Sequence, residues 1–264
     1  MEVIETASDL VQHLTSKENS AIKIKSRIIF EIIEKNKLEL PHFFTLPFPP
    51  TQIGSITVFE ATLLAALINI FDCKKIVEIG TYIGYSTAII ALNSKRDAEI
   101  ASIDLPSISP TADCEQTTRK LLQDNWQKND EFLRNYQQLK GSYYVDELPE
   151  EYRKKVDLIK CDSTEIDASI LSKLTNADLV FIDGGHSYEI VKNDTSLALA
   201  TLKSSGLIIW HDFESKIHHE VTKFVRDQFA VNESVLHIEN TMLAVFVPQL
   251  KNRIEKFLTE NQKS

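Results

Sequence analysis

The chain has 264 residues, is 43% hydrophobic and carries a formal net charge of −9. A chain of this kind can bury one full core, and its acidic balance without a basic block excludes nucleic acid as the main partner. Three cysteines without CxxC spacing argue against a thiolate metal site, and no signal peptide or membrane-spanning run is recognisable, so we expect a cytoplasmic protein without membrane contact.

The N-terminal part is predicted to be helical over residues 1–38, because its isoleucines form an amphipathic stripe. The prolines of residues 41–50 forbid helix and predict an extended segment, whose phenylalanines we expect to pack on the core. A helix follows over residues 57–71. The apolar N-terminal segment is compatible with a homodimer.

From residue 75 onward, apolar strands alternate with helices. We expect strands at 75–79, 99–104, 156–161, 178–183 and 207–211, and helices near 84–94, 115–140 (which contains Trp126), 165–174, 187–202 and 216–229. The last two runs, 234–239 and 242–247, are joined by Asn240-Thr241 as a hairpin. This alternation predicts an α/β fold with a doubly wound, mostly parallel sheet and N-terminal helices.

We divide the chain into an N-terminal cap segment (1–55), a ligand-binding domain (56–250) and a helical tail (251–264). The residues 141–155 read as a charged connector and mark no second domain.

The turn after the first strand of the alternation is the most informative motif. Glu78 ends the strand, and Gly80 and Gly84 follow with the spacing G-x-x-x-G instead of the dinucleotide pattern G-x-G-x-x-G. Glu78 would repel phosphate but attract an ammonium group or ribose hydroxyls, which favours S-adenosylmethionine over NAD. The alternative is a tight turn without a ligand. Asp104, at the end of the next strand, can bind a ribose diol.

Five strand ends carry acids, at the edge where open parallel sheets bind ligands. The alternative is that each acid caps the following helix. These residues are Glu78, Asp104, Asp162, Asp183 and Asp212.

Two further motifs indicate acid–base and metal chemistry. In FIDGGHSYE, Asp183 can bind a hard cation and His186 can act as a general base, or the histidine can merely hydrogen-bond the turn. In LIIWHDF, Asp212 ends the neighbouring strand, and its proximity to Asp183 invites a divalent cation. Magnesium suits the oxygen ligands, while His211 would also tolerate manganese, iron or zinc.

The segment VEIGTYIGYST resembles the first motif of class I S-adenosylmethionine-dependent methyltransferases, in the variant carried by small-molecule O-methyltransferases. The resemblance spans residues 54–247 and implies their Rossmann-like fold, with an antiparallel last strand. It also implies a set of cofactor-binding residues. Glu78, Gly80 and Ser86 would hold the methionine part, Asp104 the ribose, and Asp162 with Ser163 the adenine amino group. The remaining cofactor-binding residues are Thr81, Tyr85 and Asp183, of which Asp183 is also a metal ligand.

The chain is most similar to the metal-dependent sugar O-methyltransferases of macrolide pathways. That resemblance makes Asp183 and Asp212 metal ligands and His186 the base. Where those enzymes carry an acidic pair, this chain has His211 followed by Asp212. Either His211 replaces a carboxylate as the third ligand, or water does.

These features together predict O-methylation of a small molecule that carries a hydroxyl group, with S-adenosylmethionine and Mg²⁺ as cofactors. Sugar, phenol, polyketide and lipid acceptors stay open. The alternatives are a metal-dependent hydroxylase on the same scaffold and a non-catalytic S-adenosylmethionine-binding protein. An NAD-dependent dehydrogenase is disfavoured by Glu78.

Overall fold

The computed structural model describes residues 3–16, 20–35, 44–50, 54–106, 133–134, 137 and 141–248. Predictions for the loop after residue 106, for most of the polar helix 115–140 with Trp126, and for the tail 251–264 lie outside these residues. Within them, no helix combines the length and the apolar character needed to cross a bilayer.

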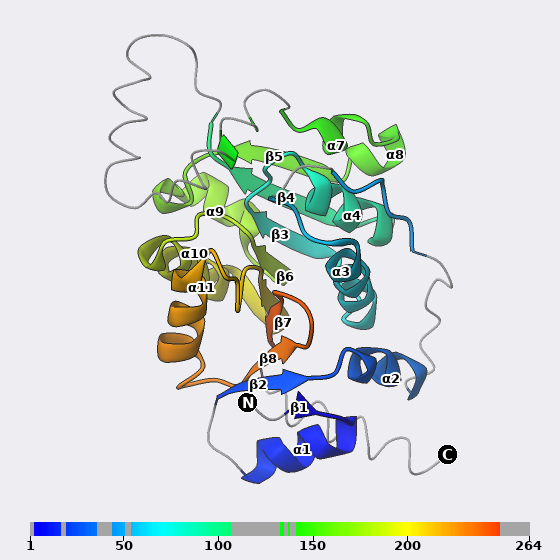
Figure 1. The fold of residues 1–264 in the computed structure, drawn as a ribbon. Coiled ribbons are helices and arrows are strands. Elements are labelled where there is room, and N and C mark those ends of the chain that lie inside the picture. The colour runs from blue at the N-terminus through cyan, green and yellow to red at the C-terminus, as the bar shows by residue number, and fades with distance from the viewer. Residues whose placement is uncertain are drawn as a thin grey trace.

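One nine-stranded sheet runs through the described residues, in the order β1-β2-β8-β9-β7-β6-β3-β4-β5 (Figure 1). Only β9 runs antiparallel to its neighbours, β7 and β8. The expected mostly parallel sheet with an antiparallel last strand is therefore confirmed. The strands are β1 (Val3–Ile4), β2 (Ala21–Ile24), β3 (Lys75–Ile79), β4 (Glu99–Asp104), β5 (Val156–Lys160), β6 (Ala177–Ile182), β7 (Leu202–Trp210), β8 (Val235–Ile238) and β9 (Ala244–Phe246).

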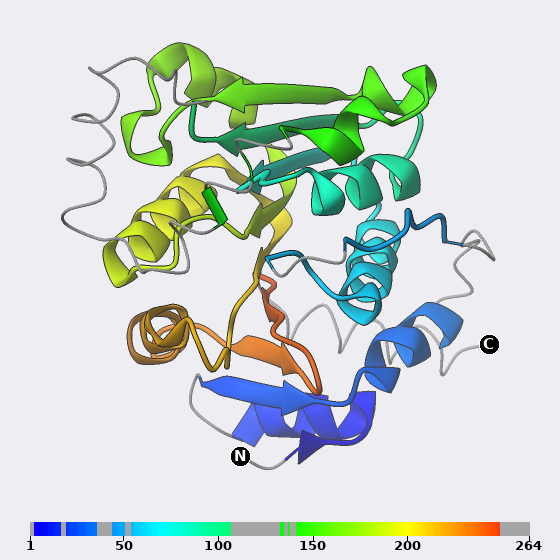
Figure 2. The ribbon, with the colours of Figure 1, turned by 45° about the horizontal axis from the view of Figure 1, so that its top comes forward.

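Helices cover both faces of the sheet, as the two ribbon views show (Figure 2). One face carries α2 (Arg27–Lys35), α3 (Val58–Ile70) and α4 (Tyr85–Asn93), with the short α7 (Tyr143–Asp146) and α8 (Glu150–Arg153) beyond α4. The other face carries α9 (Ala168–Leu174), α10 (Tyr188–Thr201) and α11 (His219–Phe224). The 3₁₀ turn η1 (Ser163–Glu165) precedes α9, and a π-helical turn, η2 (Val225–Phe229), continues α11.

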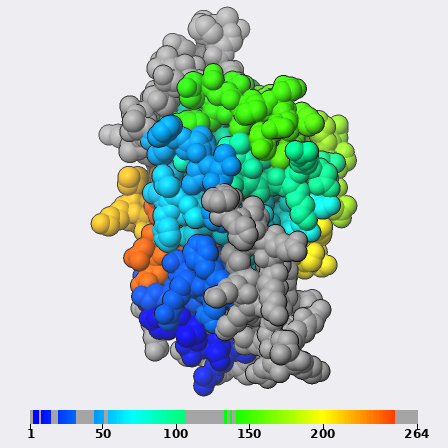
Figure 3. All heavy atoms as spheres, turned by 90° about the vertical axis from the view of Figure 1, so that its right-hand side faces the viewer, coloured from blue at the N-terminus to red at the C-terminus, as the bar shows by residue number. Residues whose placement is uncertain are grey.

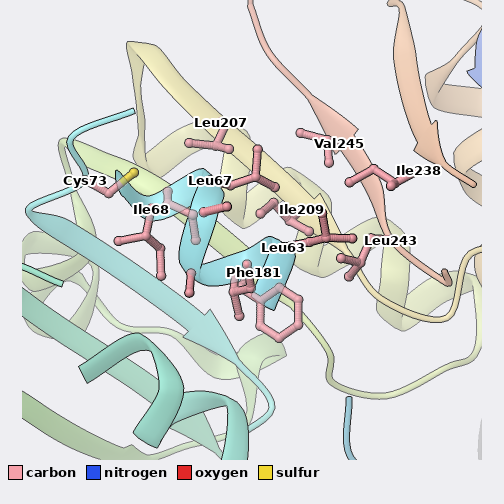
Figure 4. Close-up of a cluster of buried hydrophobic side chains, with 14 of the residues drawn as sticks. Leu63, Leu67, Ile68, Cys73, Phe181, Leu207, Ile209, Ile238, Leu243 and Val245 are labelled. Carbon is pink, nitrogen blue, oxygen red and sulfur yellow. The ribbon is translucent and has the colours of Figure 1, made fainter. Parts of the chain in front are cut away.

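The core consists of two apolar layers, one on each side of the sheet. Alternation along β3 places Ile76 in the layer under α3 and Val77 in the layer under α10 and α11. Figure 4 shows how Leu63 and Leu67 of α3 pack onto Ile209 and Val245 of the sheet. Burying each such side chain contributes about 1.5–3 kcal/mol to the free energy of folding.

Helix α3 begins as predicted, one residue after Thr57. The Thr57 hydroxyl accepts a hydrogen bond from the Glu60 amide, and the Glu60 carboxylate accepts from the Thr57 amide at 2.9 Å, which forms a capping box. Glu60 is 2% exposed, and its other oxygen accepts a hydrogen bond from the Met242 amide at 2.7 Å. The cap thus also joins α3 to the loop before β9.

The prediction of continuous helix over residues 1–38 was wrong. Helix α1 (Ala7–Ser16) and α2 exist, but β1 and β2 interrupt them. Ile22 and Ile24 alternate with more polar neighbours at period two, and β2 pairs in parallel with β8. Residues 21–24 therefore form a strand because they pair with the otherwise open edge of β8. Figure 3 shows the N-terminal residues, in blue, beside the orange C-terminal strands.

Smaller corrections concern the connections. Residues read as a charged connector form α7 and α8, and β7 begins at Leu202 instead of residue 207, with a register irregularity against β6. The residues 44–50 contain neither helix nor strand, as their prolines predict. Phe44 packs against the core as expected, whereas Phe48 is 93% exposed.

Candidate active site

A cavity of about 890 Å³ opens at the carboxyl ends of the five strands from β7 to β5. This is where an open parallel sheet is expected to bind ligands, and the volume suits a small molecule. The cavity wall includes the residues that end or follow each strand. These are Ile79 and Gly80, Ile103 and Asp104, Cys161 and Asp162, Asp183 and Gly184, and His211 and Asp212.

The glycine turn after β3 lets two backbone segments meet below the cavity. Gly80 has a φ of +102°, and a Cβ atom there would lie 2.0 Å from the carbonyl oxygen of Asp183. Gly84, with a φ of +82°, precedes α4 and faces Val145 at a similarly close approach. The absence of a side chain at Gly80 is thus what allows the turns after β3 and β6 to lie side by side.

Glu78 lies beneath this turn with no exposed surface. Its carboxylate accepts hydrogen bonds from the hydroxyls of Ser86 at 2.6 Å and Ser102 at 2.5 Å, and also from Thr87. Burial raises the pKa of Glu78 to about 7, although these hydrogen bonds lower it. The acid therefore ties α4 to β3 and β4, and its side chain does not line the cavity.

Three other residues of the same motif also point into the protein interior. The Thr81 hydroxyl lies 2.6 Å from that of Ser102, and the Tyr85 ring packs edge-on against Tyr144. The Ser86 hydroxyl donates its hydrogen bond to Glu78. The structure does not bring Glu78, Thr81, Tyr85 or Ser86 to the cavity wall, and their contact with a cofactor stays a prediction.

The acids after β4 and β5 do reach the cavity. Asp104 accepts hydrogen bonds from the Leu105 amide at 2.9 Å and from Gln137, and Lys160 lies 3.4 Å away. Burial raises the pKa of Asp104, which the charge of Lys160 partly offsets. Asp162 caps η1 by accepting from the Thr164 amide at 2.8 Å, so the capping alternative holds for this residue.

The acids after β6 and β7 meet around one imidazole ring. Nδ1 of His211 lies 3.0 Å from Oδ1 of Asp183 and 3.2 Å from Oδ2 of Asp212. Burial lowers the pKa of His211, but the two carboxylates raise it well above 6.5. Burial acts in the opposite direction on Asp212 and raises its pKa, but His211 and His186 hold that pKa well below 3.8. A protonated His211 therefore offsets the repulsion between the two carboxylates.

The other nitrogen of His211 faces Glu60. Nε2 lies 3.5 Å from Oε2 of that carboxylate, at an ion-pair distance but without hydrogen-bond geometry. Burial would raise the pKa of Glu60, and contact with His211 and two backbone amides brings it to about 2. Sequence reasoning missed this partner, although the spacing of Thr57 and Glu60 is the signature of a capping box.

His186 lies at the tip of the loop after β6, where Gly184 and Gly185 turn the chain. Its Nε2 atom is 3.0 Å from Oδ2 of Asp212, and its ring stacks on that of His218, with centroids 3.6 Å apart. Both histidines line the cavity. No sequence motif pointed to His218, which the fold brings here from the segment before α11.

The turn that carries Asp212 is held in an uncommon backbone conformation. Asp212 and Glu214 have φ values of +58° and +64°, a region that side chains other than glycine rarely adopt. The Phe213 amide donates to the carbonyl of Met242, which fixes the turn against the loop before β9. This backbone conformation costs about 1–3 kcal/mol per residue and places the Asp212 carboxylate within reach of both His186 and His211.

Asp194 of α10 is a further acid that sequence reasoning missed. It is fully buried, borders the cavity, and its Oδ2 atom has no hydrogen-bond partner among the described residues. Burial raises the pKa of Asp194 to about 6, whereas contacts with Ser163 and Asn193 lower it. An aspartate within a predicted helix is normally expected on the solvent-exposed face, so nothing in the sequence around Asp194 indicated its burial.

Comparison with family models gave one match. The model of a family described as a methyltransferase domain matches residues 77–213, more than half of the chain. Comparison with curated proteins gave no match.

Similar solved structures include a methyltransferase of Podospora anserina bound to S-adenosylhomocysteine, which is 13% identical, covers 92% of this chain and 94% of its own, and has a TM-score of 0.49. An O-methyltransferase of Bacillus cereus, also bound to S-adenosylhomocysteine, is 13% identical with coverages of 83% and 90% and a TM-score of 0.44. An O-methyltransferase from the tomaymycin pathway of Streptomyces achromogenes is 13% identical with coverages of 83% and 89% and a TM-score of 0.45.

Proposed function

Because the chain belongs to the methyltransferase-domain family, we propose that it transfers a methyl group from S-adenosylmethionine to a hydroxyl oxygen of a small molecule. Asp183, His211 and Asp212 would hold a divalent cation, preferably Mg²⁺, which would supply Lewis acidity to the acceptor hydroxyl, and His186 acts as general base. The observation that carries the proposal is the convergence of these four residues on one cavity at the strand ends.

The cofactor would occupy the part of the cavity bordered by Gly80, Asp104, Asp162 and Ser163. When bound, S-adenosylmethionine supplies an electrophilic methyl group. Asp104 is suited to accept hydrogen bonds from ribose hydroxyls, at the expense of its present partner Gln137. The work of these residues is to orient the cofactor toward the acceptor, because alignment of the two reactants is the main requirement of methyl transfer.

The donor atoms of Asp183, His211 and Asp212 suit a divalent cation. They lie within 4.8 Å of one another, and two of the pairs are separated by 3.0 and 3.2 Å. Octahedral Mg²⁺ with ligands at 2.0–2.1 Å requires neighbouring donors about 3 Å apart, so a cation would need little movement of these atoms but would have to replace the proton of His211. A cation held there would make a coordinated hydroxyl group more acidic.

His186 is well placed to receive the proton that the acceptor hydroxyl loses. Asp212 holds its Nε2 atom at 3.0 Å, which orients the ring. His186 and Asp212 are only 8% and 7% exposed, so an acceptor bound in the cavity would cover what remains of their accessible surface. Proton transfer within such a site avoids competition from bulk water.

Calorimetry with S-adenosylhomocysteine, with and without Mg²⁺, tests cofactor and cation separately. We expect binding to the wild type, weaker binding by about tenfold or more in Asp104→Asn because a ribose contact is lost, and no Mg²⁺ effect in Asp212→Asn. Asp157→Asn changes an exposed acid on β5 and serves as the matched control.

Transfer of labelled methyl groups to a panel of hydroxylated sugars and phenols tests the reaction itself. We expect Mg²⁺-dependent labelling that His186→Ala lowers by about 10²–10⁴-fold. A protein that neither binds S-adenosylhomocysteine nor consumes S-adenosylmethionine would refute the proposal. Full activity of His186→Ala would refute the base assignment alone.

A further inference from the structure

Two histidines and one carboxylate form a second cluster in the same cavity. The rings of His186 and His218 stack with an interplanar angle of 18°, and Oδ2 of Asp212 lies 3.0 Å from Nε2 of His186. One potential ligand atom from each of the three residues lies within 4.8 Å of the other two. This cluster shares only Asp212 with the group formed by Asp183, His211 and Asp212.

The two clusters differ in the kind of donor that they offer. The first provides two carboxylates and one imidazole, whereas the second provides two imidazoles and one carboxylate. Mg²⁺ prefers oxygen donors, while Zn²⁺ and Co²⁺ bind imidazole well and follow the general affinity order of first-row metals. The second cluster is therefore the better site for a transition-metal ion.

We propose that His186, Asp212 and His218 form a second cation site that binds Zn²⁺ in preference to Mg²⁺, and that Zn²⁺ bound there inhibits methyl transfer. The inhibition rests on the proposed function, because it follows from the role of His186 as the base. A histidine nitrogen that donates its lone pair to Zn²⁺ is not available to accept a proton.

The proximity and burial of the three side chains support such a site. Zn²⁺ with ligands at about 2.0–2.1 Å in tetrahedral arrangement requires donors about 3.3 Å apart, and the nearly parallel rings of His186 and His218 would turn so that both lone pairs point at the ion. His186, Asp212 and His218 are 8%, 7% and 5% exposed, and all three line the cavity. An ion would enter through the cavity, and water or an acceptor oxygen would complete its coordination.

Cobalt serves as the spectroscopic probe of this site, because Zn²⁺ is silent and Co²⁺ absorbs visible light according to its coordination. We would titrate the wild type, His218→Asn and the control His219→Asn with Co²⁺, in the presence of excess Mg²⁺. His219 is the exposed neighbour of His218 and belongs to neither cluster. Loss of one ligand should weaken Co²⁺ binding by about tenfold or more in His218→Asn alone.

The functional arm measures, for each variant, the inhibition by Zn²⁺ relative to its own activity with Mg²⁺. Zn²⁺ should inhibit the wild type and His219→Asn, and His218→Asn should require at least about tenfold more Zn²⁺. If no acceptor supports methyl transfer, the function fails, but the Co²⁺ titration still decides whether the site exists.

Equal Co²⁺ affinity of the wild type and His218→Asn would overturn the proposal and leave the stacked rings as a packing contact. Circular dichroism establishes that each variant is folded. If His218→Asn does not fold, anomalous diffraction from wild-type crystals soaked in Zn²⁺ replaces it. A peak between His186, Asp212 and His218 supports the site, and a peak only at Asp183 and His211 refutes it.

Discussion

His211 and Glu60 face each other at 3.5 Å across the space between β7 and α3. The contact joins the strand end that carries the candidate metal ligand to the capped start of a helix on one face of the sheet. Glu60 therefore has two roles, in the capping box with Thr57 and in holding the ring whose other nitrogen meets Asp183 and Asp212. Stability and site geometry are coupled through this one carboxylate.

Replacing Glu60 should destabilise the protein strongly. We expect Glu60→Ala to lower the free energy of unfolding by about 2–4 kcal/mol, because it removes one half of the capping box, leaves the Thr57 and Met242 amides without their acceptor and takes away the negative charge beside His211. Glu60→Gln, which keeps an acceptor oxygen, should cost less. Urea unfolding measures both, with Thr62→Ala on the same helix as the control. Equal losses in both Glu60 variants would contradict this view.

The same carboxylate should make stability fall at low pH. Its pKa is about 2 in the folded protein and 4.5 ordinarily, so the stabilisation is fully present above pH 4.5 and disappears as the pH falls toward 2. The difference in midpoint of thermal unfolding between wild type and Glu60→Gln should therefore shrink between pH 5 and pH 3. A constant difference over this range would show that the charge of Glu60 is not involved.

Removing Glu78 should leave three buried hydroxyls without their acceptor. Glu78→Ala should lower the free energy of unfolding by about 2–4 kcal/mol, because Ser86, Thr87 and Ser102 all donate to the lost carboxylate. Glu78→Gln retains an acceptor of the same shape and is the matched control. Chemical unfolding at pH 7 gives both values. If Glu78→Ala were neutral in stability yet lost S-adenosylhomocysteine binding, Glu78 would act on the cofactor directly.

Asp194→Asn should stabilise the protein at neutral pH but not at low pH. The pKa of Asp194 is raised by burial from 3.8 to about 6, so the folded state is penalised progressively as the pH rises from about 4 to 6. This corresponds to at most about 3 kcal/mol above pH 6. The midpoints of thermal unfolding of wild type and Asp194→Asn at pH 4.5 and pH 8 test this prediction. A larger increase of the variant's midpoint at pH 4.5 than at pH 8 would contradict it.

Gly80→Ala should disrupt the meeting of the two turns below the cavity. Its new Cβ would lie 2.0 Å from the Asp183 carbonyl oxygen, so either the protein unfolds more easily or Asp183 moves. Gly141→Ala is the matched control, because Gly141 also has a positive φ but nothing lies within 4 Å of the added carbon. We expect the control to cost about 1 kcal/mol and Gly80→Ala clearly more, with weaker S-adenosylhomocysteine binding. Similar costs would show that the close approach is relaxed easily.

Local patterns predicted the central part of the fold well. Strands β3 and β4 have the expected bounds, because their apolar runs end sharply at an acid or a glycine. β1 and β2 were missed, since residues 21–24 become strand only by pairing with β8, whose position depends on the whole fold. No periodicity within residues 1–38 contains that information.

The candidate site was predictable to the extent that it follows strand ends. Asp104, Asp183, His186 and Asp212 reach the cavity because sheet topology brings their backbone there. Glu78 lies one residue before the end of β3, but its side chain points beneath the turn, where the hydroxyls of α4 and β4 surround it. The direction of a side chain and the arrival of His218 depend on tertiary packing, which sequence spacing does not reveal.

The pairing of β2 with β8 has a consequence for biosynthesis. Ala21 lies beside Val235, so β2, whose other sheet neighbour is the two-residue β1, gains this partner only after β3 to β8 have been synthesised. Until then, the edge of β2 that pairs with β8 has no backbone partner. Chaperone capture of the nascent chain should therefore concentrate on this N-terminal segment, and release should coincide with the emergence of β8.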